Sequence, residues 1–216
     1  MKKIYPSLIA AKLLEAKQEI EKLEQYCAGF HLDVMDNHFV PNLTFGASFV
    51  NEVARVTTKQ LFVHLMIDNP FEFLDQVKLK KGDILSIQYA SMQDIPHMLN
   101  AIKKKDLLVS IAINPDISLE KIYPYIKTLD QVVIMSVKAG FSGQSFIPET
   151  IKKARALVAY RQEYNLTFDI CMDGGINSNN IQELAHLGVD SFVVGSGIFN
   201  TPDPLMELHK LNTLIN

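Results

Sequence analysis

The chain has 216 residues, of which 48% are apolar and 21% charged, with a net charge of −3 and a pI near 6.1. This length predicts one globular domain, residues 1–216, with a full hydrophobic core. The mild negative charge argues against a nucleic-acid partner, and no apolar stretch reaches the ~20 residues that cross a membrane. Two cysteines, Cys27 and Cys171, are too few for a disulfide framework. Because no signal peptide is evident either, we expect a reduced, cytoplasmic protein.

Eight short apolar runs recur along the chain, and longer amphipathic segments separate them. The runs begin at Lys3, Gly29, Leu61, Ile84, Leu107, Val132, Phe168 and Ser191. They are nearly continuous rather than alternating, which is typical of parallel strands covered by helices. Apolar residues recur at helical spacing between them, as in 13–23, 151–160 and 205–211, and predict helices. Eight strand–helix units of about 27 residues each favour an α/β fold, a single closed (β/α)8 TIM barrel.

The ends of the predicted strands bring together residues that can bind a metal. In such a barrel, residues at the carboxyl ends of the strands face the active site. His31 and Asp33 are two apart on one strand and share a face, while His64 and Asp173 end two other strands. This set suits one divalent cation, with zinc, iron(II), manganese and cobalt all compatible. The plainer alternatives are that the histidines are ordinary strand residues, that Asp33 is only a ligand, and that Asp173 only caps the turn at Gly174.

Two carboxylates beside one cation also suggest acid–base chemistry. Burial raises the pKa of a carboxyl group and a metal lowers it, so the pair can take different roles. The cation can polarise a carbonyl group and stabilise a developing enediolate. Four methionines near the strand ends are either core filler or an apolar wall around the reacting carbons. They are Met35, Met66, Met135 and Met172.

Glycine-rich loops follow three neighbouring strands, at 138–145, 173–175 and 195–197. Glycines let backbone N–H groups approach an anion closely, and loops after the last two strands of a barrel often bind phosphate. Each pair of glycines alone could mark only a turn. Three such loops together predict a phosphorylated ligand. The loop 138–145, with Phe141 between its glycines, could also act as a lid.

Taken together, these residues resemble the ribulose-phosphate 3-epimerase family. The matching stretches are Pro6-Ser7-Leu8, 31–42, 63–66, 134–137, 140–148, Asp173-Gly174-Gly175 and Gly195-Ser196. They follow the family order over nearly the whole chain. The resemblance implies a barrel enzyme of the pentose phosphate pathway. It also implies a homo-oligomer. Its substrate would be a phosphorylated ketose.

The resemblance also implies roles for individual residues. One divalent cation would be held by His31, Asp33, His64 and Asp173. Asp33 and Asp173 would move a proton at C3 on opposite faces of the ketose phosphate, converting ribulose 5-phosphate to xylulose 5-phosphate. The substrate contacts would be Ser7, His64, Gly140, Phe141, Ser142, Gly143, Gly174, Gly175, Gly195 and Ser196.

The chain departs from the family pattern at a few positions. Gln88 stands where the family usually has histidine, Lys138-Ala139 where it has proline before a glycine, and Asn37 and Ser142 where it has glycine. None removes a metal ligand, but they leave the sugar open, with allulose 6-phosphate as the alternative. Two further alternatives are a phosphate-barrel decarboxylase or aldolase and a non-catalytic sugar-phosphate binder. Related decarboxylases have a lysine in an Asp-x-Lys-x-x-Asp motif, whereas residues 33–36 of this chain contain no lysine. A protein that only binds a sugar phosphate would not need both aspartates and both histidines.

Overall fold

The computed structural model describes all 216 residues, and its eight strands form one parallel sheet. The strands are β1 (Lys3–Pro6), β2 (Gly29–Met35), β3 (Gln60–Met66), β4 (Ile84–Gln88), β5 (Leu108–Ile113), β6 (Gln131–Met135), β7 (Asp169–Asp173) and β8 (Ser191–Val194). Their order is β1-β8-β7-β6-β5-β4-β3-β2. A parallel bridge between Ser7 and His31 and a bond from Ala28 N to Ile4 O join β1 to β2. The sheet is therefore a closed barrel, as predicted, and each predicted strand start is within one residue.

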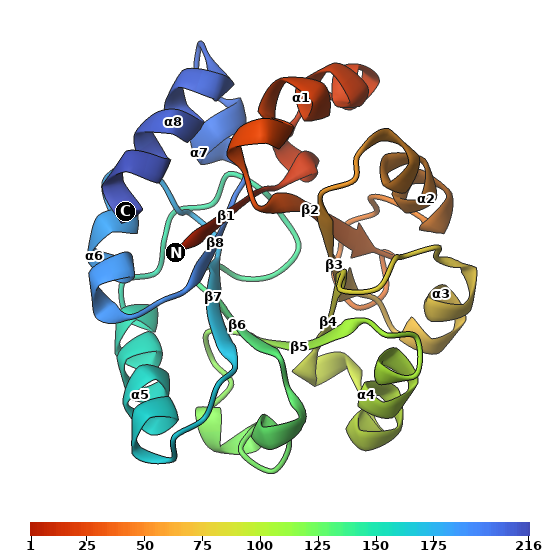
Figure 1. The fold of residues 1–216 in the computed structure, drawn as a ribbon. Coiled ribbons are helices and arrows are strands. Elements are labelled where there is room, and N and C mark those ends of the chain that lie inside the picture. Colours follow the sequence, from red (N-terminus) through yellow and green to blue (C-terminus); the bar gives the residue numbers. More distant parts are fainter.

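Helices surround the barrel on the outside (Figure 1). They are α1 (Ala16–Leu23), α2 (Ala47–Val56), α3 (Pro70–Gln76), α4 (Ile95–Lys103), α5 (Thr150–Glu163), α6 (Ile181–Leu187), α7 (Ser196–Phe199) and α8 (Pro204–Ile215). Local sequence explains several starts. The side chain of Asp203 accepts hydrogen bonds from two backbone N–H groups of α8, and that of Asp94 accepts one from His97 N of α4. Each of these caps stands just before a proline in the first turn, where no N–H is needed.

The connection from β5 to β6 differs from the predicted strand–helix alternation. It contains two 3₁₀ turns, Leu119–Lys121 and Ile126–Thr128, and no α-helix. Pro124 lies between them and has no N–H for a helical hydrogen bond. The ammonium group of Lys153 on α5 donates to three backbone carbonyls of this connection, at residues 114, 115 and 117. The connection has no α-helix of its own, and the hydrogen bonds from Lys153 hold its backbone in position.

Strand alternation separates an outer core from the barrel interior. The outer core contains 51 buried residues between strands and helices, and the interior holds a separate apolar cluster of 12. On β2, the outward residues are Phe30, Leu32 and Val34, and the inward ones are His31, Asp33 and Met35. Because successive side chains point to opposite faces, one strand supplies both packing and polar site residues.

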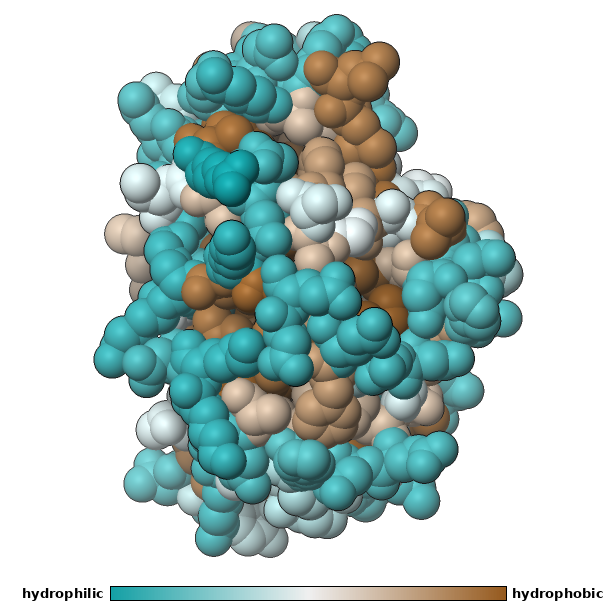
Figure 2. Space-filling view, turned by 90° about the vertical axis from the view of Figure 1, so that its right-hand side faces the viewer, coloured by the Kyte–Doolittle hydropathy of each residue, from teal (hydrophilic) through white to brown (hydrophobic).

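The outer face over α2 and α3 is largely hydrophilic, with smaller hydrophobic patches between the polar side chains (Figure 2). This matches helices that bury only one side. In α2, for example, Val50 and Val53 are buried, while its other residues are partly or fully exposed. No helix in the structure combines the length and the apolar character that a membrane crossing requires.

Candidate active site

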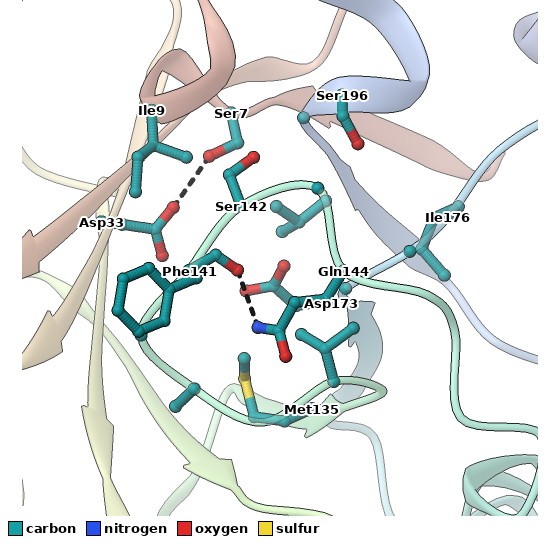
Figure 3. A pocket seen from close by; sticks show the side chains of 18 of the residues that line it. Ser7, Ile9, Asp33, Met135, Phe141, Ser142, Gln144, Asp173, Ile176 and Ser196 are labelled. Carbon is teal, nitrogen blue, oxygen red and sulfur yellow. Dashed lines mark hydrogen bonds between the residues drawn. The ribbon is translucent and has the colours of Figure 1, made fainter. Parts of the chain in front are cut away.

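A cavity lies at the carboxyl ends of the strands. Fourteen of the predicted site residues line it: Ser7, Asp33, Met35, Met66, Met135, Gly140, Phe141, Ser142, Gly143, Asp173, Gly174, Gly175, Gly195 and Ser196. The other two, His31 and His64, are fully buried beside Asp33 and Asp173. The fold therefore brings the predicted set to one place, and Figure 3 labels Ser7, Asp33 and Asp173 among the lining residues.

Two histidines and two aspartates form a compact cluster at this cavity. His31, Asp33, His64 and Asp173 each offer one ligand atom, and these atoms lie within 4.8 Å of one another. His64 Nδ1 is 3.5 Å from both Asp33 Oδ1 and Asp173 Oδ2, and His31 Nε2 is 3.8 Å from Asp173 Oδ2. Atoms that share one cation at ~2.1 Å are themselves about 3–3.5 Å apart. The two His64 distances match that spacing, and the wider pairs, up to 4.8 Å, would have to close slightly around a cation.

The hydrogen-bond inventory of the cluster gives an independent test of that fit. His31 Nε2, His64 Nδ1 and Asp173 Oδ2 are buried and have no hydrogen-bond partner. Buried polar atoms without a partner are rare and costly. Three of them facing one point, from imidazole and carboxylate groups, suit a divalent transition-metal ion. The four residues could hold one such cation, whose identity the donor set leaves open among zinc, iron, manganese and cobalt.

Ser7 orients two members of the cluster. Its hydroxyl donates to Asp33 Oδ2 at 2.9 Å and lies 3.0 Å from His31 Nδ1. A hydroxyl that gives its hydrogen to a carboxylate can accept one from the imidazole. That pattern places the hydrogen of His31 on Nδ1 and leaves a free lone pair on Nε2, the atom that faces Asp173. Ser7, predicted as a substrate contact, also has this positioning contact.

Burial and mutual contacts set the charges of the cluster. Burial raises the pKa of Asp33, but the neighbouring imidazoles of His31 and His64 outweigh it and hold that pKa well below its ordinary value. Burial lowers the pKa of His64, whereas the nearby carboxylates of Asp173 and Asp33 raise it, to about 9 overall. Asp33 is therefore ionised at neutral pH and available as a ligand or a proton acceptor.

A serine and two glycines fix the end of β7, which carries Asp173. Ser136 Oγ donates to the backbone carbonyls of Asp173 and Gly174, at 3.0 and 2.6 Å. Gly174 and Gly175 follow with φ of +117° and +65°, a region that L side chains rarely adopt. A Cβ atom at Gly175 would also lie 2.5 Å from Phe146 N. The turn after β7 therefore requires glycine and holds Asp173 in place.

The loop 138–145 covers one side of the cavity (Figure 3). Asn42 Nδ2 donates to Gly140 O at 2.7 Å, which ties this loop to the segment after β2. Gln144 Nε2 donates to the carbonyls of Lys138 and Phe141, at 2.6 and 2.8 Å, and so closes the loop on itself. Phe141 is 53% exposed at the mouth. Ala139 and Gly140 are buried, whereas residues 141–143 are exposed, so these contacts fix the start of the loop and its middle faces the mouth.

The sequence did not single out several residues of the site. Ile9, Val137, Ala139, Gln144, Ile176 and Val193 also line the cavity. Gln144 was detectable in principle, since it lies in the glycine-rich loop. Met172 points the other way and packs in the outer core, so it is filler and no part of a wall. Its position, one residue before Asp173, places it on the opposite face of the strand.

The comparisons with known proteins agree with this geometry. The Ribulose-phosphate 3 epimerase family matches residues 3–199. The chain belongs to this family. The ribulose-phosphate 3-epimerase of Chlamydia pneumoniae is 37% identical over 209 residues, covering 94% of this chain and 90% of the relative. That of Aquifex aeolicus is 34% identical over 216 residues, covering 100% and 97%.

A solved structure shows the same fold at a much lower identity. The 3-keto-L-gulonate-6-phosphate decarboxylase of Vibrio cholerae superposes with a TM-score of 0.68 and 13% identity, covering 100% of this chain and 98% of that one. At that identity the likeness extends to the fold alone. Family membership makes the chain an isomerase of the carbohydrate-phosphate 3-epimerase type, a family that acts on phosphorylated sugars.

Proposed function

We propose that this epimerase interconverts D-ribulose 5-phosphate and D-xylulose 5-phosphate. The observation that carries the proposal is the pair Asp33 and Asp173, two carboxylates that face one cavity from different sides. They stand on β2 and β7, which β1 and β8 separate in the ring of strands. Inversion at a carbon needs an acceptor and a donor on opposite faces of a planar intermediate, and this pair meets that need.

In the proposed reaction, Asp33 removes the C3 proton of ribulose 5-phosphate. The electron pair of the C3–H bond forms a C2–C3 double bond, and the C2 carbonyl oxygen takes up the negative charge as an enediolate. Asp173 then gives a proton to the other face of C3, and the C2 carbonyl forms again. In the reverse direction the two aspartates exchange roles. Asp33 is ionised at neutral pH, as a proton acceptor must be.

His31, Asp33, His64 and Asp173 would hold a divalent cation beside the reacting carbons. Such a cation would supply positive charge near the oxygens on which negative charge develops. Ser7 keeps the carboxylate of Asp33 and the ring of His31 in their relative orientation. Met35, Met66 and Met135 line the same cavity and would form an apolar wall that keeps water from the intermediate.

The phosphate group would bind among the glycine-rich loops, away from the carboxylates. Gly143, Gly175 and Ser196 line both the main cavity and an adjoining hollow that Asn177 and Gly197 also line. Glycines at these positions let backbone groups approach an anion. Binding at this remote group would position C3 between the aspartates, and Gly140, Phe141 and Ser142 would close over it. We also propose a homo-oligomeric, cytoplasmic enzyme, on the family resemblance alone.

The test is a conversion in deuterated water. Purified protein with Mn²⁺ is mixed with ribulose 5-phosphate, and products are followed by NMR. We expect xylulose 5-phosphate with deuterium at C3. Parallel arms with allulose 6-phosphate and fructose 6-phosphate measure the sugar preference, and we expect the pentose phosphate to have the higher kcat/KM. No product and no exchange at C3 in any arm would refute the proposal.

A matched pair of variants separates catalysis from folding in the same assay. Asp173→Asn alters the proposed donor, while Asp169→Asn makes the same chemical change at the other end of β7, where Asp169 pairs with Lys3. The first is expected to lose turnover and the second to keep it. Equal activities in the two variants would remove Asp173 from the reaction.

A further inference from the structure

One contact of the metal-ligand cluster has no part in the function proposed above. Gln88, the last residue of β4, is fully buried, and its Nε2 atom lies 3.0 Å from His64 Nε2. This is the only hydrogen-bond contact of the Gln88 side chain with the cluster, and Gln88 Oε1 is buried without a partner. The two side chains therefore meet through one pair of atoms, and the protonation of His64 decides which of them donates.

A cation at the cluster restricts that choice. His64 Nδ1 is the ring atom that faces Asp33 and Asp173, so it is the atom with a lone pair for the cation. A neutral imidazole that offers Nδ1 as a ligand carries its hydrogen on Nε2. The amide NH₂ of Gln88 is also a donor, and two donors cannot share a hydrogen bond. The amide must then present its oxygen to His64.

The fold permits this arrangement without moving the backbone. A half-turn about the last side-chain bond of Gln88 exchanges Oε1 and Nε2, which have nearly the same shape. It gives the unpartnered oxygen a donor, the N–H at His64 Nε2. Gln88 pairs in register with Ala112 on β5, and Asn114, two residues further on, has a buried Oδ1 atom with no donor. Asn114 directly follows the end of β5 at Ile113, and by the strand alternation its unpartnered oxygen lies on the same face of the sheet as the freed NH₂ group.

We propose that Gln88 is a positioning residue of the metal centre, whose side-chain carbonyl accepts the Nε2–H of His64 and presents His64 Nδ1 to the cation. This inference rests on the metal site of the proposed function. Partners behind a metal-bound histidine fix the tautomer and the angle of the ring, and their loss typically weakens metal affinity about 10–100-fold. Gln88 acts through His64 and touches no reacting atom.

The test compares cation affinities of three variants with that of the wild type. Gln88→Met keeps the side-chain length and removes the acceptor, while Gln88→Glu keeps an acceptor at the same place. Gln131→Met is the matched control, because Gln131 is another buried barrel glutamine that bonds only to Ser110 and Ser191. Dissociation constants for Zn²⁺ and Mn²⁺ are measured by competition with a chelator of known affinity.

We expect the dissociation constant to rise about 10–100-fold in Gln88→Met and to stay within about threefold of wild type in Gln88→Glu and Gln131→Met. Histidine labelled with ¹⁵N supplies a second readout in the zinc-loaded proteins. The Nε2–H of His64 should give a downfield, slowly exchanging proton signal in the wild type and in Gln88→Glu. That signal should be lost or shifted upfield in Gln88→Met.

Two results would overturn the inference while leaving the proposed function intact. One is a Gln88→Met protein that binds both cations as tightly as the wild type and keeps the same Nε2–H signal. The other is a Gln131→Met protein that loses as much affinity as Gln88→Met, since the effect would then belong to the barrel interior at large. A wild type that binds neither cation would instead refute the metal site of the proposed function. Circular dichroism of each variant checks that it is folded.

Discussion

The two ends of the barrel interior differ in whether their polar side chains have hydrogen-bond partners. At the amino ends of the strands, polar groups bond to one another: Lys3 to Asp169 at 2.7 Å, Tyr5 to Gln60 at 2.6 Å, and Gln131 to Ser110 and Ser191 at 3.0 and 3.4 Å. At the carboxyl ends, His31, His64 and Asp173 each keep a buried atom without a partner. Both sets of side chains lie in the same barrel, on strands of the same sheet.

The contrast indicates that the polar residues at the amino ends of the strands stabilise the fold, whereas those at the carboxyl ends serve the reaction. A buried polar group whose hydrogen bonds are all made within the protein gains no free energy from a further ligand. A buried polar group without a partner is stabilised when a ligand binds to it. The same substitution should therefore act mainly on turnover at one end and mainly on stability at the other. Pairs of variants that share a strand or a residue type measure this difference between the two ends.

The largest expected effect is on Asp173. Asp173→Asn should lower kcat by about 10³-fold or more, because it removes a proton-transfer group and alters a metal ligand. Asp169→Asn, on the same strand, should leave kcat within about twofold and lower the free energy of unfolding by about 1 kcal/mol or less, since its partner Lys3 is half exposed. Steady-state kinetics and urea unfolding of both proteins measure the two effects.

Metal removal should come next. Dialysis against a chelator is expected to abolish turnover, and adding Mn²⁺, Zn²⁺, Co²⁺ or Fe²⁺ should restore it with at least one ion. Because the cation binds the folded state, the loaded protein should also have a higher Tm than the stripped one. A stripped enzyme, shown metal-free by elemental analysis, that turns over at the normal rate would contradict the metal site.

Ser7 offers a milder test at the mouth. Ser7→Ala removes the hydroxyl between Asp33 and His31, so we expect kcat/KM to fall about 10–100-fold. Ser191→Ala removes a fully buried hydroxyl at the other end of the interior and should leave kcat/KM nearly unchanged. If the two alanine variants lost activity equally, the position of the hydroxyl along the barrel would not matter and the comparison would fail.

Gln131 tests the stability side. Gln131→Met should lower the free energy of unfolding by about 1–3 kcal/mol, because Ser110 and Ser191 lose their shared partner in the interior. That loss corresponds to a fall in Tm of several degrees for a chain of this size. Calorimetry measures it, and the kinetic constants should remain within about twofold of wild type. A kinetic defect without a stability defect would reverse the assignment.

The smallest expected effect concerns Asp36 and pH. Burial raises the pKa of Asp36, but backbone N–H bonds from Asp68, His38 and Phe39 together outweigh this and lower the pKa below its ordinary value. A carboxylate with a lowered pKa stabilises the fold above the ordinary carboxyl pKa of ~4, and this contribution is lost as pH falls through the folded value.

Asp36→Asn should therefore cost about 1 kcal/mol or less at pH 7, since Asp36 is only partly buried, and almost nothing near pH 2. Urea unfolding at both pH values checks this. Asp75→Asn is the control, because Asp75 is highly exposed and bonds only to Lys105. A cost for Asp36→Asn that grows as the pH falls would show that the sign is wrong.

Much of the fold could be predicted because a closed parallel barrel leaves its strands buried on both faces. Continuous apolar runs such as those of β3 and β6 are a direct consequence. The ligand set could also be predicted, because side chains two apart on a strand share a face and strand ends meet at one rim. Residue spacing along the chain carries all of that information.

Contacts between distant segments could not be predicted in the same way. The Asn42 bond to Gly140 joins residues 98 positions apart, and the Gln88 contact with His64 depends on the register of β3 against β4. The β5–β6 connection was expected to be helical, and Pro124 and Lys153 give the physical reasons for its 3₁₀ turns. Met172 lies near a strand end like the other three methionines, but a shift of one residue along the strand places its side chain in the outer core.

The most direct test of the account is proton exchange by the two Asp→Asn variants. Each is incubated with each sugar, ribulose 5-phosphate or xylulose 5-phosphate, in deuterated water with Mn²⁺, and deuterium at C3 is followed by NMR. Asp173→Asn retains Asp33 and should exchange the C3 proton of ribulose 5-phosphate alone, without forming xylulose 5-phosphate. Asp33→Asn should exchange only xylulose 5-phosphate. Both variants exchanging the same sugar, or either one inverting C3 at the wild-type rate, would contradict a reaction between two opposed aspartates.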